Sequence, residues 1–161
     1  MTTNAAKPSR TILCPTDFSP ASEQALLHAA GQCGNDSELI VLHISKAGSG
    51  EHGSLLKEHL HNFSNYSTLL SAYECRVRFA VEYASTPSAT IIEFSDKADA
   101  DMIVMGSHGA SDLRRLLVGS TAEAVMRQAS RPVLVLKSPK RDGEKAVHQK
   151  EQTEVLTNPN D

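Results

Sequence analysis

Three glycines and a serine at fixed spacing are the residues of this chain best suited to bind a ligand. Gly106-Ser107-His108-Gly109 is followed, after nine further residues, by Gly119-Ser120, which gives the pattern G-x2-G-x9-G-[ST]. Glycines lack a Cβ atom and therefore let backbone N–H groups approach a phosphate closely. Ser120 begins a predicted helix, and a helix start offers unpaired N–H groups and partial positive charge. The pattern predicts an anion site that needs no lysine.

A second glycine pattern, at residues 48–53, matches the dinucleotide-binding sequence G-x-G-x-x-G at every letter. Its context differs from that of a true dinucleotide site. Ser45, Lys46 and Ala47 separate it from the preceding strand, and all its glycines precede the next helix. The acidic residue expected about 20 residues later at a strand end is replaced by Glu74, which lies before a strand. We interpret the segment as a loop. The absence of any Gly-Lys-[Ser/Thr] sequence excludes a Walker P-loop.

The elements that must position these residues alternate between strands and helices. Strands are predicted from short apolar runs, and the third, which alternates apolar and polar residues, is expected at a sheet edge. Helix starts are predicted from Ser19-Pro20, from Thr86-Pro87 and from the capping box Ser120-Thr121-Ala122-Glu123, in which Ser120 is the expected N-cap. The strands are predicted at 11–14, which Pro15 closes, and at 38–44, 75–83, 101–105 and 131–136; the helices are predicted at 20–33, 54–73, 87–98 and 120–129.

This alternation predicts a single α/β domain, an open parallel sheet with helices on both faces and right-handed crossovers. In such sheets ligands bind beyond the carboxyl ends of the strands, at the topological switch point. We therefore expect the site among the loops after Cys14, Ile44, Tyr83 and Met105. Leu56, Leu60 and Phe63 recur at helical spacing in the second predicted helix and are expected in the core.

Composition argues against several partner classes. The net charge of −3 and the aromatic content of 4%, with no tryptophan, disfavour nucleic acid as a partner. No apolar run approaches the roughly 18 residues of a membrane span, and the amino terminus shows no secretory signal, so we expect a cytoplasmic protein. Cys14, Cys33 and Cys75 are expected to be reduced and buried. Residues 1–9 are expected to be flexible, and the polar, aperiodic residues 139–161 to form a disordered tail.

The glycine pattern resembles the ATP-binding signature of the universal stress proteins. Residues 11–19 resemble the first strand and turn of that family, residues 39–44 its second strand, and residues 100–106 and 130–136 its fourth and fifth strands. The resemblance covers residues 10–138. It implies a Rossmann-like domain with a five-stranded parallel sheet in the order 3-2-1-4-5.

The resemblance also implies roles for individual residues. Family members that keep the glycine signature bind ATP, and this chain keeps every position of it. It departs from the family at Ser85-Thr86-Pro87, where members commonly have G-x-P. Mg²⁺ is expected to be held through the phosphates. The expected binding residues are Pro15, Thr16, Asp17 and Ile44 on the ribose and adenine side, Gly106, Gly109, Gly119, Ser120 and Thr121 at the phosphates, and Met105, Ser107 and His108 beside them.

Simpler structural roles stay open for several of these residues. Asp17 can be a turn residue, Ser120 a helix cap and His108 an exposed side chain between glycines. A metal site built from histidines is not expected, because His59 and His61 point to different faces of a helix.

The sequence favours a nucleotide-responsive stress or signalling module with at most weak ATPase activity. No base, nucleophile or arginine clamp can be placed at the phosphates, and Asp17 is expected on the adenine side. The alternatives are an ATP-independent dimeric scaffold and a slow ATP-hydrolysing enzyme. A homodimer is expected through Val133–Leu136, because this last strand is apolar throughout and should lie at a sheet edge. The family resemblance implies the same mode of pairing.

Overall fold

The computed structural model describes residues 7–46, 52–108 and 118–137, and within them strands and helices alternate as the sequence predicts. Of the residues 1–9 that are predicted to be flexible, 1–6 lie outside the described residues, as do Gly109 and the predicted tail 139–161. The elements are β1 (Arg10–Thr16), α1 (Pro20–Gly31), β2 (Ser37–Ser45), α2 (His52–Leu70), β3 (Arg76–Tyr83), α3 (Pro87–Lys97), β4 (Met102–Gly106), α4 (Ser120–Gln128) and β5 (Val133–Leu136).

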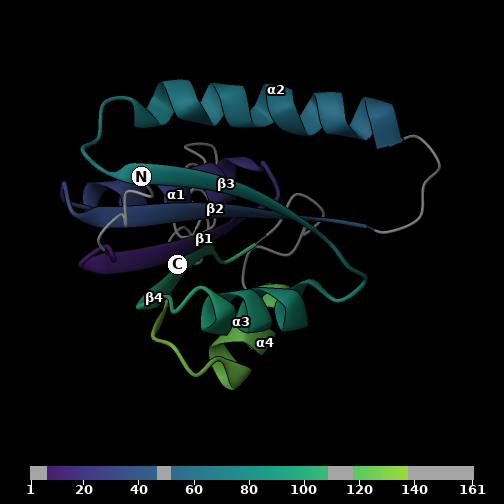
Figure 1. Cartoon of the computed structure of the whole chain (residues 1–161). Helices are drawn as coiled ribbons and strands as arrows, with labels where there is room; N and C mark the ends of the chain where they lie inside the picture. The colour runs from purple at the N-terminus through teal and green to yellow at the C-terminus, as the bar shows by residue number, and fades with distance from the viewer. Residues whose placement is uncertain (1–6, 47–51, 109–117, 138–161) are drawn as a thin grey trace, which may run out of the picture.

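The five strands form one parallel sheet in the order β3-β2-β1-β4-β5, which confirms the predicted fold. Helices α1 and α2 cover one face of the sheet, and α3 and α4 cover the other (Figure 1). β3 lies at one edge of the sheet, as its alternating sequence predicts. No helix in the described part of the chain is long and apolar enough to cross a membrane.

Two hydrophobic clusters, one on each face of the sheet, form the core. The side chains of β1 alternate between them: Ile12 and Cys14 pack beneath α1 and α2, whereas Leu13 packs against the α3 and α4 face. All three side chains are fully buried. A strand covered on both faces needs apolar residues at every position, which explains the unbroken apolar runs of β1 and β2.

β1 extends beyond its predicted end, because Pro15 does not close it. The strand continues to Thr16, and Pro15 pairs with Leu42 of β2. A proline is tolerated in this central strand because the ladder between β1 and β4 covers only Ile12 and Leu13. The missing N–H of Pro15 therefore lies beyond the part of β1 that pairs with β4.

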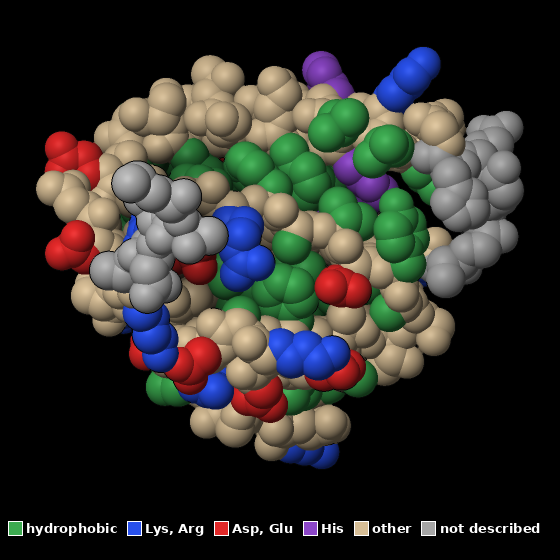
Figure 2. Space-filling model, viewed as in Figure 1, with side chains coloured by type: hydrophobic (Ala, Val, Ile, Leu, Met, Phe, Trp, Pro, Cys, Tyr) green, Lys and Arg blue, Asp and Glu red, His purple; other side chains and the backbone are tan. Residues whose placement is uncertain are grey.

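The buried face of α2 differs from the predicted one. His59, Phe63, Tyr66 and Leu70 face the sheet and are buried. Leu56 and Leu60 are 52% and 60% exposed, so the expectation that they belong to the core is wrong. Hydrophobic side chains lie along the seam between α2 and the sheet, and some reach the outer surface near the amino-terminal end of α2 (Figure 2). A different stripe of the same helix also has helical spacing, and it consists of His59, Phe63, Tyr66 and Leu70.

The three cysteines are unpaired, as expected. Cys14 is fully buried, and burial raises the pKa of its thiol to about 12. Cys33 and Cys75 are only half-buried, so the expectation of full burial holds for Cys14 alone.

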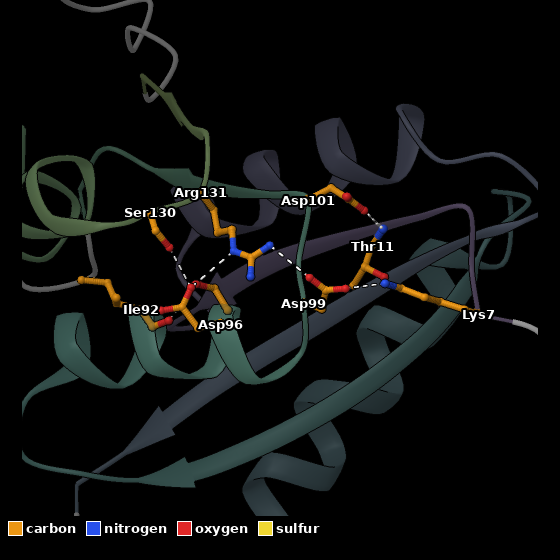
Figure 3. A network of polar contacts seen from close by, with 9 residues as sticks. Lys7, Thr11, Ile92, Asp96, Asp99, Asp101, Ser130 and Arg131 are labelled. Carbon is orange, nitrogen blue, oxygen red and sulfur yellow. Dashed lines mark hydrogen bonds and ion pairs between the residues drawn. The ribbon is translucent and has the colours of Figure 1, made fainter.

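A polar network ties three connecting segments together at the amino-terminal end of the strands (Figure 3). The guanidinium of Arg131, just before β5, donates to Asp96 at 3.3 Å and to Asp99 at 3.2 Å, both at the carboxyl end of α3 or just after it. Lys7 forms an ion pair with Asp99, and Asp101 accepts from the backbone N–H of Thr11 at 2.7 Å. These contacts fix the starts of β1, β4 and β5, which leaves the opposite end of the sheet for the loops that form the site.

Candidate functional site

A pocket of about 440 Å³ opens at the carboxyl ends of the strands. It lies where β1 and β4 continue past the two residue pairs that join them. Sheet order reverses direction between these two strands, so this is the switch point at which parallel sheets bind ligands. The volume falls within the range of about 300–1,000 Å³ that is typical of small-molecule sites.

The pocket brings together eleven of the twelve residues predicted from the sequence, and the twelfth, Gly109, lies outside the described residues. Five further lining residues were not predicted. The lining residues that were predicted are Pro15, Thr16, Asp17, Ile44, Met105, Gly106, Ser107, His108, Gly119, Ser120 and Thr121; the additional ones are Ser22, Leu42, Pro87, Ile91 and Ala122.

One end of the pocket is apolar. Leu42, Ile44 and Met105 come from the ends of β2 and β4, and Pro87 and Ile91 come from the first turns of α3. Two signals in the sequence could have identified Leu42 and Ile91, which were not predicted. Leu42 lies two residues before Ile44 and so shares its face of the strand, and Ile91 lies four residues after Pro87 on one side of a helix.

The other end of the pocket is the amino terminus of α4. The N-cap is Gly119, with φ −61° and ψ 154°, and no side chain caps the helix within the described part of the chain. The predicted capping box is therefore wrong: Ser120 is the first helical residue and not the cap. A glycine N-cap has no side-chain oxygen to offer, so among the described residues no cap side chain competes with a ligand for the first N–H groups of α4.

Backbone and side-chain contacts join this helix start to the segment after β4. Gly119 N donates to Ser107 O at 2.6 Å, and Ser107 N donates to Leu136 O at 2.8 Å. Ser107 Oγ and His108 Nδ1 lie 2.8 Å apart. His108 Nε2 is buried and has no hydrogen-bond partner within the structure described. A buried polar nitrogen without a partner is costly, and a ligand with an oxygen at this point would satisfy it.

Gly106 is required by close packing as well as by the pocket. A Cβ atom placed on it would lie 3.0 Å from Ala21 O and 3.1 Å from Ala21 C in the backbone of α1. The first glycine of the pattern therefore lets the end of β4 approach α1. This reason is independent of any bound phosphate.

Asp17 forms the turn between β1 and α1 and also lines the pocket. Its Oδ1 accepts from Ser19 N and from Ser22 Oγ, each at 3.0 Å. The turn role that the sequence left open is thus real, and it fixes an acceptor-only carboxylate among the residues that line the pocket. The next residue, Phe18, has φ 62°, a left-handed conformation that non-glycine residues rarely adopt.

No cluster of three or more histidine, cysteine or acidic side chains able to hold a metal occurs in residues 7–46, 52–108 or 118–137. His43 lies behind the turn, and its Nδ1 donates to Thr16 O at 2.9 Å. Burial is the main cause that lowers the pKa of this imidazole.

Comparisons with known proteins identify one family for the chain and its fold. The sequence profile of the universal stress protein family matches residues 8–137. Universal stress protein MJ0531 of Methanocaldococcus jannaschii is 34% identical over 142 residues, covering 81% of this chain and 84% of that protein.

Two solved structures extend the comparison. The structure of MJ0577 from the same organism has a TM-score of 0.70 at 29% identity, covering 83% of this chain and 99% of that one. The universal stress protein of Archaeoglobus fulgidus in complex with dAMP has a TM-score of 0.66 at 22% identity, covering 81% and 99% of the two chains.

Proposed function

The chain belongs to the universal stress protein family, and from that premise we propose that it is a cytoplasmic, ATP-binding stress or signalling module of the subgroup that carries the glycine signature. The observation that carries the proposal is the start of α4, which has no side-chain cap among the described residues and lines a pocket with eleven of the predicted residues. An anion at this point would accept from the first N–H groups of the helix and meet the partial positive charge of its terminus.

The chemistry of the pocket fits a nucleoside polyphosphate from end to end. Leu42, Ile44 and Ile91 offer an apolar surface for a base. Asp17 is an acceptor for the hydroxyl groups of a sugar and would repel phosphate, so it belongs between base and phosphates. The phosphates then lie at Gly119, where they can also reach His108 Nε2, which has no hydrogen-bond partner among the described residues.

In this arrangement Ser120 and Thr121 supply hydroxyl groups beside the helix terminus, and Mg²⁺ is held through the phosphates. The binding of dAMP by a family member of the same fold supports an adenine nucleotide as the ligand. The proposal also assigns Gly109 to the phosphates, on the family resemblance.

Mass spectrometry of the freshly purified, denatured protein tests the class of ligand. We expect ATP or another adenine nucleotide to be released in a fixed ratio to protein. Release of a chemically different ligand from this pocket would overturn the proposal. A protein that carries no nucleotide and takes up none when ATP is added would favour the ATP-independent scaffold.

Hydrolysis of bound ATP is expected to be slow or undetectable. Asp17, the one carboxylate among the described lining residues, accepts from Ser19 N and Ser22 Oγ in the turn, and the proposal assigns it to the sugar and not to the terminal phosphate. A phosphate-release assay with Mg²⁺ and saturating ATP should give a turnover far below about 1 s⁻¹, the low end of ordinary enzyme rates. Turnover at or above that rate would require a catalytic group and would replace a binding module with an enzyme.

We also propose that the chain forms a homodimer through β5. This strand pairs only with β4 in the described sheet, and all four of its residues are apolar and half-buried. Val133 and Val135 pack toward α3 and α4, and Leu134 and Leu136 toward α1 and α2. A second copy paired along the open edge would satisfy the free backbone groups of the strand and cover its side chains.

Val135→Lys is expected to convert the dimer to a monomer at micromolar concentration, because a lysine in the pair would be buried next to its symmetry mate. Size-exclusion chromatography with light scattering measures the change. Val81→Lys, a half-buried valine of the opposite edge strand, is the matched control and should remain dimeric. A wild-type protein that is monomeric under these conditions would contradict the proposal.

A further inference from the structure

A chain of buried hydroxyl groups leads from α2 to Asp17 in the pocket. Tyr66 OH lies 3.0 Å from Thr16 Oγ1, and Thr16 Oγ1 lies 3.0 Å from Ser22 Oγ. Ser22 Oγ in turn donates to Asp17 Oδ1 at 3.0 Å. Tyr66, Ser22 and Thr16 are 4%, 5% and 6% exposed, so these contacts form away from solvent.

The carboxylate sets the direction of the protons in this chain. A hydrogen bond to a charged acceptor is stronger than one to a carbonyl, so the single proton of Ser22 goes to Asp17 and not to Ser19 O. Ser22 Oγ can then only accept from Thr16. Thr16 Oγ1, which also accepts from Phe18 N at 3.0 Å, is left to accept from Tyr66. Each hydroxyl donates once, and successive bonds of this kind polarise one another.

The phenol of Tyr66 is suited to be the first donor. Burial is the largest cause that raises its pKa, so the group keeps its proton at neutral pH. Tyr66 is also the only member of the chain that comes from outside the β1–α1 segment. Its hydroxyl therefore fixes the side chain of Thr16 from across the core.

The same helix also supports the backbone of the turn. The left-handed Phe18 is held by ring contacts with His43 at 4.6 Å, Phe63 at 5.4 Å and Tyr66 at 5.5 Å between centroids. A residue in this conformation persists only where its surroundings impose it. Phe63 and Tyr66 both belong to α2, so α2 constrains the residues on either side of Asp17.

We propose that Tyr66 is a positioning residue of the nucleotide site, which holds Asp17 through Thr16 and Ser22 in the orientation that accepts the hydroxyl groups of the ribose. The inference rests on the proposed function and extends it to a residue that lies outside the pocket lining. It predicts that losing one phenol oxygen affects recognition of the sugar and leaves recognition of base and phosphates unchanged.

Tyr66→Phe is expected to weaken ATP binding by about three- to tenfold, the change that one hydrogen bond produces. Affinity for 2′,3′-dideoxyATP, which has no ribose hydroxyl groups for Asp17, should stay within about twofold of the wild-type value. Calorimetric titration of both nucleotides measures the difference. Tyr73→Phe is the matched control, because it removes a phenol oxygen from a side chain packed on the same hydrophobic cluster and should alter neither affinity.

Ser22→Ala interrupts the chain at its middle and provides a second variant with the same expected selectivity. The double variant should lose no more affinity for ATP than the weaker-binding single variant, because both substitutions break one chain. Equal losses for ATP and dideoxyATP would overturn the inference, since they would indicate general loosening of the site. Wild-type affinity in Tyr66→Phe would overturn it while leaving the proposed function intact. A wild-type protein that binds neither nucleotide would instead overturn the proposed function itself.

Discussion

Gly119→Val is expected to lower ATP affinity by at least about a hundredfold, or about 2.7 kcal/mol, with the fold retained. Gly119 is buried, lines the pocket and is the N-cap of α4. Its φ of −61° is open to valine, so the backbone need not change. The branched side chain would instead occupy the space in which phosphates approach the first N–H groups of the helix. Equilibrium dialysis with radiolabelled ATP measures the loss, and circular dichroism reports on the fold.

Gly34→Val is the control for this substitution. Gly34 follows α1 at the opposite end of the sheet, and a Cβ atom there would meet nothing within 4 Å. ATP affinity should be that of the wild type. Unchanged affinity in Gly119→Val would show that the phosphates bind elsewhere and would remove the main support for the proposed site.

Gly106→Ala is expected to lower the free energy of unfolding by about 1–3 kcal/mol, the usual cost of overpacking. The added methyl group would meet the backbone of Ala21 at 3.0 Å, and backbone atoms cannot rotate away as the end of a flexible side chain can. Urea unfolding at equilibrium, without nucleotide, measures the difference and separates it from any effect on binding.

Gly31→Ala is the matched substitution with the opposite expectation. Gly31 ends α1, and a Cβ atom there meets nothing within 4 Å. Alanine should leave stability unchanged or raise it by up to about 1 kcal/mol through its higher helix propensity. If Gly106→Ala were as stable as Gly31→Ala, the close approach of β4 to α1 would not be a constraint on the sequence.

Most of the fold could be predicted from the sequence because the relevant signals are local. Runs such as 38–44, apolar at almost every position, can be stable only between two helical layers, and Ser19-Pro20 and Thr86-Pro87 mark helix starts that the structure reproduces. The face of α2 that is buried against the sheet could not be predicted from local signals. Leu56 and His59 both fit a helical period, and only the position of the sheet decides which of them is buried.

In the candidate site, too, the features with a local sequence signal were predictable and the others were not. Glycine spacing predicted the segments that meet at the switch point, because a backbone requirement is visible in sequence. The N-cap of α4 was misassigned, since Gly119 and Ser120 are both acceptable caps and the sequence S-x-x-E favours the second. The link between Tyr66 and Thr16 spans 50 residues and depends on how α2 lies across β1, so no local pattern reports it.

Isothermal titration of the wild-type protein with ATP and Mg²⁺ tests directly whether the pocket binds ATP. We predict saturable binding of one ATP per chain, which inorganic phosphate at equal concentration does not displace, because phosphate alone would reach the helix terminus and none of the apolar lining residues. A protein that gives no binding signal for ATP at millimolar concentration, while folded by circular dichroism and free of retained nucleotide, would contradict the account.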